Sequence, residues 1–297
     1  MKKKSLTNKT RGIIAGYLFI SLWLVGLLIF TMWPLIQAVF YSFNEVKFSG
    51  SSLNIVSNGF ITNYVYAFGE DLIFPTLLKS YLASILVQVP FLVTMALILA
   101  MLLNRKMKMR TFFRVIFFLP VIISTGPVIK ELMNQGATTL PQVASSSMTS
   151  FLEDYLPTFI SVPISLLLDN LIIVLWYTGI PVLIMLAGLQ RIDKSSYEAA
   201  YIDGASSWQC FWKVTLPSMK SFILVSVIYS IVTLSFSGIP VKEGEQTILD
   251  YMQYHMISVG GLGYGYACTL GIIFFIAILL QIGLWSLLLM PRERRRK

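Results

Sequence analysis

Charged residues are scarce in this 297-residue chain, where Asp, Glu, Lys and Arg together make up 12% and hydrophobic residues make up 56%. Soluble domains carry roughly 25% charged residues. A water-soluble globule of this composition would expose a large apolar surface, so an ordinary cytosolic enzyme and a disordered regulator are both excluded. The mean hydropathy of +0.74 instead indicates an integral membrane protein.

Cysteine and histidine are also nearly absent, with two cysteines and one histidine in the whole chain. A disulfide-rich secreted scaffold is therefore excluded. Cys210 falls in a basic segment and Cys268 in a long apolar run, so the two are not expected to pair. His255 is expected to be a solvated loop residue. The sequence offers no metal-ligating cluster, no nucleophile–base set and no G-x-x-x-x-G-K-[ST] loop for a nucleotide.

Long apolar runs occupy most of the chain. A bilayer core about 30 Å thick needs about 20 apolar residues per helix. The sequence predicts six such helices, over residues 13–33, 80–103, 112–133, 164–189, 218–237 and 266–290. The expected fold class is therefore an all-α integral membrane protein with six transmembrane helices. The first run exceeds the hydrophobic part of a signal peptide and is interpreted as a retained span.

The basic residues are unequally divided between the segments that join these runs. Nineteen of the 23 lie before the first run, between the second and third, between the fourth and fifth, or after the sixth, when Arg114 and Lys220 at the adjoining ends of the third and fifth runs are included. Because cytoplasmic loops carry the excess of Lys and Arg, both termini are predicted to be cytoplasmic. The positive charge then reflects topology and contact with anionic lipid headgroups, and no nucleic-acid partner is expected.

The basic segment between the fourth and fifth runs predicts two short helices that meet at a bend. Ser195 and Glu198 have the spacing of a capping box, which would start the first helix. Gly204 can end that helix by adopting a left-handed conformation. Ser206 or Ser207 can then cap the second helix.

An aromatic stripe follows the bend. Trp208, Phe211 and Trp212 are spaced at i, i+3 and i+4, so they share one face of the second helix. This face either seats against another protein or packs against the chain's own helices. Pro217 suits the first turn of the membrane span that follows.

The same segment carries a family resemblance. The pattern E-A-A, three residues, G, nine residues, V-x-L-P resembles the EAA loop of binding-protein-dependent ABC importer permeases, and it begins at Glu198 and ends at Pro217. The usual form has Ile where this chain has Val214. The surrounding string 197–205, together with Leu-Ala-Gly-Leu-Gln at 186–190, is similar to the carbohydrate branch that contains the maltose-type permeases. The resemblance covers roughly residues 76–290.

This resemblance implies the ABC importer type I permease fold and a domain organisation. Residues 1–12 would be a cytoplasmic tail, and residues 13–75 would hold the first transmembrane helix and an extracellular segment. Residues 76–290 would form the permease core, with an EAA coupling loop at 191–217, and residues 291–297 would be a basic cytoplasmic tail. The residues implied to couple to an ATPase are Glu198, Ala199, Ala200, Asp203, Gly204, Trp208, Leu216 and Pro217.

The resemblance also implies partners in a bacterial inner (cytoplasmic) membrane. They are a second homologous permease, two ATP-binding subunits at the EAA loop, and an extracellular solute-binding protein. This chain would then be no enzyme and would bind no cofactor, because ATP and Mg would be held by the ATPase subunit. For Glu198 two roles stay open, a basic partner on the ATPase or a purely helix-capping function.

Polar and aromatic groups in the middle of three predicted spans mark a possible path for a sugar or oligosaccharide. These candidates are Ser124, Thr125, Trp176, Tyr177, Thr178, Tyr229, Ser230 and Thr233. Polar residues within a membrane usually face the bundle interior or an aqueous cavity. Ordinary interhelical hydrogen bonding is the competing interpretation. An ion-coupled secondary transporter is the alternative function, but the chain lacks the Asp, Glu or His near mid-depth that such proteins tend to use.

Overall fold

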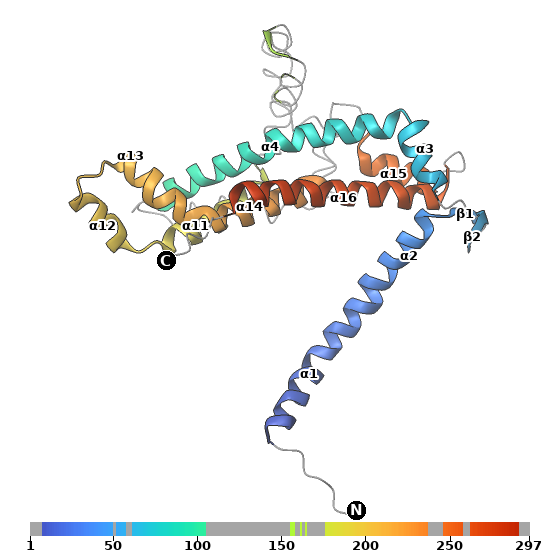
Figure 1. Ribbon diagram of the computed structural model, residues 1–297, viewed down its shortest axis with the longest axis horizontal. Coiled ribbons are helices and arrows are strands. Elements are labelled where there is room, and N and C mark those ends of the chain that lie inside the picture. The colour runs from blue at the N-terminus through green and yellow to red at the C-terminus, as the bar shows by residue number, and fades with distance from the viewer. Residues whose placement is uncertain are drawn as a thin grey trace, which may run out of the picture. The chain divides into compact units, whose positions relative to one another are not determined.

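The structure is a computed structural model that describes residues 8–49, 52–57, 61–104, 155–157, 161, 164, 176–236, 246–257 and 262–290. Apart from one short hairpin, the regular elements among these residues are helices (Figure 1). The chain divides into two compact units. The first comprises Met1–Asp71 and Met252–Ile273, and the second comprises Leu72–Tyr251 and Phe274–Lys297.

Long apolar helices confirm the membrane-protein prediction for four of the six runs. Helical segments that are long and apolar enough to cross a bilayer cover Gly16–Ser42, Ile73–Asn104, Ser207–Phe236 and Tyr264–Leu289. They correspond to the first, second, fifth and sixth predicted runs. The run 112–133 lies outside the described residues. The fourth run is described at residue 164 and from residue 176 onward, and its latter part forms the helix α11 (Gly179–Arg191).

The first unit begins with a long helical segment made of α1 (Asn8–Leu27), a π-helical turn (Leu28–Met32) and α2 (Trp33–Ser42). An antiparallel hairpin follows, formed by β1 (Glu45–Ser49) and β2 (Ser52–Ser57), and then α3 (Thr62–Gly69). The hairpin is a local departure from the all-α prediction. Val46 of β1 is fully buried, so one face of this strand contributes to the core of the unit.

The second unit is built around three mutually packed helices, α4 (Ile73–Asn104), α11 and α14 (Leu216–Phe236). A glycine allows a close contact between two of them, because a Cβ on Gly188 of α11 would lie 2.6 Å from the Phe222 ring and 2.8 Å from Met219 Sδ in α14. The hydroxyls of Tyr81 and Ser235 bond across α4 and α14. Small residues and polar cross-links of this kind are how helices associate in a bilayer, where the hydrophobic effect between them is absent.

Two further helices complete the described chain. The helix α15 (Ile248–Ile257) precedes α16 (Tyr264–Leu289), and each contributes residues to both units. In the second unit Gln281 Nε2 of α16 donates a hydrogen bond of 3.2 Å to the Leu82 carbonyl of α4. In the first unit Thr269 Oγ1 donates to the Ser42 carbonyl at 2.9 Å. Side-chain donors on α16 therefore bond to backbone carbonyls in each unit.

Candidate functional site

The predicted coupling segment begins with α12 (Lys194–Ile202), and its cap differs from the expected one. Asp193, in extended backbone, accepts a hydrogen bond of 3.2 Å from the Ser195 N–H, so the predicted capping box of Ser195 and Glu198 is wrong. Aspartate caps as well as serine does, and its charge also favours the positive end of the helix dipole. The hydrogen bond from the Ser195 backbone lowers the pKa of the Asp193 carboxyl.

Glu198 is left with its carboxylate on the surface. Its side chain is exposed and makes no hydrogen bond or ion pair with any described residue. Because Asp193 caps α12, the geometry does not favour a purely helix-capping role for Glu198. A charged group on a partner could reach this carboxylate without displacing an internal contact.

The bend after α12 is built on Gly204, as the sequence predicts. Gly204 has φ +78°, a left-handed backbone conformation that residues other than glycine and asparagine adopt only at an energetic cost. Its N–H donates to the Tyr201 carbonyl at 3.0 Å, and the Ala205 N–H donates to the Ala200 carbonyl at 2.9 Å. These two bonds form a Schellman motif, which satisfies the last carbonyls of the helix.

The second helix, α13 (Ser207–Cys210), starts at a complete capping box. Ser206 Oγ accepts a hydrogen bond from the Gln209 N–H at 3.3 Å, and Gln209 Oε1 accepts one from the Ser206 N–H at 2.9 Å. Ser206 rather than Ser207 is therefore the cap. Together the bend and the box fix both sides of the turn.

The second helix does not end before the membrane span. A π-helical turn (Phe211–Thr215) joins α13 directly to α14, so Ser207–Phe236 is one continuous helical segment. In this turn the Leu216 N–H bonds to the Phe211 carbonyl, five residues back. Pro217, which supplies no N–H, follows at once and lies in the first turn of α14, as expected. The π-helical turn thus lets the helix continue through Pro217, which cannot donate a hydrogen bond to the preceding turn.

The predicted aromatic stripe is a compact cluster on the surface. The ring centroids of Trp208 and Trp212 lie 5.6 Å apart, and those of Phe211 and Trp212 lie 5.2 Å apart. Trp208 is 69% exposed, and Ile202 on the other side of the bend is 87% exposed. The described helices therefore do not bury these side chains. Exposed apolar patches of this kind mark surfaces that bind other proteins or lipid.

The predicted substrate-path residues are only partly described. Ser124 and Thr125 lie outside the described residues. Ser230 is buried, and its Oγ donates to the Ser226 carbonyl at 2.7 Å within α14, so its hydroxyl proton is satisfied internally. The others range from half-buried to buried and are Trp176, Tyr177, Thr178, Tyr229 and Thr233.

The packing of α11 on α14 indicates a common depth for these residues. Gly188 contacts Met219, and the two helices run in opposite directions from the coupling segment. Thr178 is ten residues before Gly188, and Tyr229 is ten residues after Met219. With a helical rise of 1.5 Å per residue, both lie about 15 Å from that contact.

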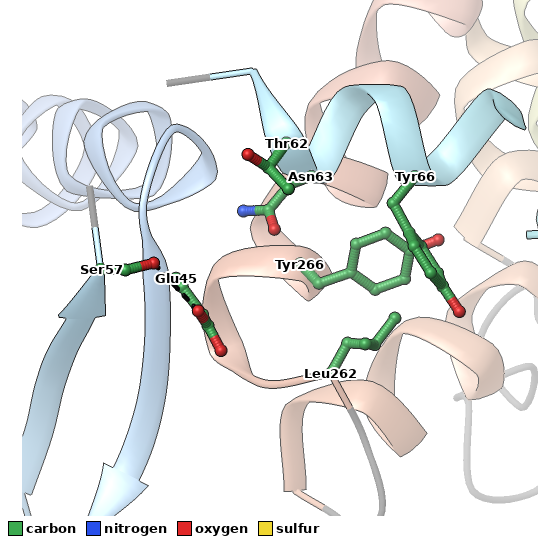
Figure 2. A pocket seen from close by; sticks show the side chains of 7 residues that line it. All are labelled: Glu45, Ser57, Thr62, Asn63, Tyr66, Leu262 and Tyr266. Atoms are coloured by element: carbon green, nitrogen blue, oxygen red, sulfur yellow. Dashed lines mark hydrogen bonds between the residues drawn. The ribbon is translucent and has the colours of Figure 1, made fainter. Parts of the chain in front are cut away.

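A small pocket in the first unit was not predicted from the sequence. It has a volume of about 210 Å³, and Figure 2 shows its lining, which is Glu45, Ser57, Thr62, Asn63, Tyr66, Leu262 and Tyr266. The rings of Tyr66 and Tyr266 meet edge to face with centroids 5.4 Å apart. The lining residues fall in two groups, 45–66 and 262–266, that are about 200 positions apart in the chain, so no local pattern could have identified them together.

Behind this pocket lies a buried polar group that corrects the prediction for His255. The histidine lies in α15, is only 7% exposed, and accepts a hydrogen bond at Nδ1 from the Leu262 N–H at 3.2 Å. Its ring packs against Tyr266, whose hydroxyl donates to the carboxylate of buried Asp71. Burial lowers the pKa of His255, and the charge of Asp71 opposes this shift only partly.

Acidification is expected to destabilise the first unit through His255. The unfolded histidine takes up a proton near its ordinary pKa of about 6.5, whereas the folded one does so only at lower pH. The free energy of unfolding is therefore unaffected by His255 above the ordinary pKa, and it decreases as the pH falls from there toward the lowered pKa of the folded state. Between about pH 7.5 and 5.5 the melting temperature should fall by a few degrees more for the native protein than for His255→Gln, which keeps an acceptor. Equal pH dependence of the two proteins would contradict the prediction.

Residues 74–295 match the family described as binding-protein-dependent transport system inner membrane component. The multiple sugar-binding transport system permease protein MsmF of Streptococcus mutans is 30% identical, over 89% of this chain and 91% of that protein. The arabinooligosaccharides transport system permease protein AraP of Bacillus subtilis is 28% identical, over 89% and 85%. A chain in the crystal structure of a bacterial ABC transporter involved in the import of the acidic polysaccharide alginate superposes with a TM-score of 0.62. It covers 97% of this chain and 100% of its own length at 19% identity.

Proposed function

Because this chain belongs to the family of binding-protein-dependent transport system inner membrane components, we propose that it forms the translocation path of an ATP-driven ABC importer for a sugar or oligosaccharide. It is a multi-pass membrane protein and a permease subunit. The observation that carries the proposal is the surface-exposed bend of α12 and α13, which is continuous with the membrane helix α14. An ion-coupled transporter would not need such a segment.

The energy for transport would come from a separate subunit. We propose that two ATP-binding subunits, which hold ATP and Mg, dock on the coupling segment 191–217. A second homologous permease would complete the pore, and an extracellular solute-binding protein would deliver the solute. The exposed aromatic cluster and the free carboxylate of Glu198 support the docking surface, since both are available without rearrangement.

The proposed topology has six spans with both termini on the cytoplasmic side of the bacterial cytoplasmic membrane. The distribution of 19 of 23 basic residues supports it. In the structure the coupling segment begins with Arg191 at the end of α11 and carries the exposed residue Lys213. In the proposed topology these cations lie on the cytoplasmic side of the membrane, where anionic lipid headgroups would attract them.

The solute is proposed to pass alongside α11 and α14 at the level of Thr178 and Tyr229. These residues lie at equal distances from the Gly188 contact, and Trp176 is close to the same depth. Aromatic rings and hydroxyls at one level suit the C–H faces and hydroxyls of a neutral sugar. We propose the same path role for Ser124, Thr125, Tyr177, Ser230 and Thr233.

Charge reversal at Glu198 tests the proposal. In Glu198→Lys, like charges would face each other across the docking surface, and such juxtaposition costs several kcal/mol. Co-purification of the ATPase subunits with this chain from membranes, and their ATP hydrolysis, should fall at least about tenfold, since each 1.4 kcal/mol is a factor of ten.

The matched control is Glu198→Asp, which keeps the carboxylate and should keep most of both signals. Thermal unfolding of the purified chain should be the same for the two variants, because Glu198 is exposed and bonds to no described residue. If Glu198→Lys assembles with the ATPase and supports hydrolysis normally, the docking role of this segment is wrong.

A further inference from the structure

One hydrogen bond closes the base of the coupling segment. The hydroxyls of Tyr197 and Thr215 lie 2.8 Å apart, although the two residues are 18 positions apart in the chain. Tyr197 is half-buried in α12, and Thr215 is 6% exposed at the end of the π-helical turn. The bond therefore joins α12 directly to the residue that precedes the membrane helix α14.

The chain between these two residues is held as a closed loop. The Schellman motif at Gly204 fixes the end of α12, and the capping box of Ser206 and Gln209 fixes the start of α13. From α13 the backbone continues into α14 without interruption. With both ends of the loop tied together, α12, the bend and α13 are expected to move as one body.

The connection of α12 to α11 is weaker. Only Ile192 and Asp193, both in extended backbone, separate these two helices. Among the described residues, the Tyr197 hydroxyl makes the only side-chain hydrogen bond from α12 to another helix. The described residues also leave a cavity of about 360 Å³ beside α12. Its lining comes from the ends of α4 and α11, from α12 and from the segment 207–215. Among the described residues, the bond between Tyr197 and Thr215 is therefore the one side-chain hydrogen bond through which a displacement of α12 would reach α14.

We infer that Tyr197 is a positioning residue that transmits movement of the ATPase docking surface to α14, an inference that rests on the proposed function. Thr215 is the point at which this movement enters the helix. It lies where the backbone hydrogen bonds change register, directly before Leu216 and Pro217. This is where the helical hydrogen-bond ladder is most easily deformed, so α14 can tilt from its first turn.

The test compares the full complex with and without this bond. The complex would be co-purified with its ATPase subunits and trapped with ATP and vanadate, and hydrogen–deuterium exchange would be followed in residues 216–224. In the native complex trapping should change exchange in this segment. In Tyr197→Phe the change should shrink about three- to tenfold, the range that corresponds to losing one hydrogen bond, while the rate of ATP hydrolysis is retained.

Three matched variants separate transmission from a general loss of structure. Thr215→Val removes the same bond, together with a long hydrogen bond of 3.4 Å from Thr215 Oγ1 to the Cys210 carbonyl. It should give at least the same effect, and the double variant should add nothing beyond Thr215→Val. Thr215→Ser keeps the hydroxyl and should behave as the native protein. Tyr17→Phe removes a hydroxyl in α1, outside the coupling segment, that bonds to no described residue, and should also behave as the native protein.

The outcomes are distinct. An unchanged exchange response in Tyr197→Phe overturns the inference, and so does a loss of assembly or of ATP hydrolysis in this variant, which would indicate a structural role. A native chain that does not co-purify with an ATPase overturns the proposed function itself, and the inference with it.

Discussion

Replacement of Gly204 by valine is expected to prevent the coupling segment from engaging its ATPase. Gly204 has φ +78°, and this left-handed conformation costs an L-residue roughly 1–2 kcal/mol, with a β-branched residue the most strained. The bend orients Ile202 and Trp208 on either side of the turn, so a changed backbone misaligns the whole docking surface. Co-purification of the ATPase subunits should fall roughly tenfold or more, by the relation of 1.4 kcal/mol to a factor of ten.

Gly204→Asn is the control for this experiment. Asparagine tolerates the left-handed region, and a Cβ at this position has no other atom within 4 Å, so steric crowding plays no part. The asparagine variant should therefore keep most of the ATPase signal, and both variants should keep the helical content measured by circular dichroism. If valine and asparagine behave alike, the conformation of Gly204 does not determine docking.

The sequence contained enough local information to predict the bend but not the helix boundaries around it. Glycine after a short helix and a serine three residues before a glutamine are signals that depend on near neighbours alone. Asp193 and Ser195 are equally good caps, so spacing could not decide between them, and the structure has Asp193. Pro217 usually marks a helix start or break, and the π-helical turn that carries the helix through it has no sequence signature of its own.

The first unit was the part least accessible to sequence reasoning. Its pocket and its buried histidine both depend on contacts between residues 41–71 and 252–266. Hydrophobic periodicity reports on one helix or strand at a time and carries no information about such distant pairs.

Gly265, in the first turn of α16, makes a close contact with the backbone of residues 44–46, and Gly265→Ala is expected to be strongly destabilising. A Cβ on Gly265 would lie 2.1 Å from the Asn44 carbonyl oxygen and 3.0 Å from the Val46 nitrogen. Both neighbours are backbone atoms, which cannot rotate away as a side chain can. Overpacking typically costs 1–3 kcal/mol and occasionally more, so the unfolding free energy should fall by about 3 kcal/mol or more.

Gly271→Ala provides a control in the same helix and the same unit. A Cβ there has no other atom within 4 Å, and alanine is a better helix former than glycine by about 1 kcal/mol. Thermal unfolding of the full chain in detergent should therefore show a large fall in melting temperature for Gly265→Ala and none for Gly271→Ala. Equal melting temperatures would mean that α16 does not approach the backbone of residues 44–46 as closely as the structure shows. A selective fall would show that this backbone contact contributes strongly to holding α16 in the first unit.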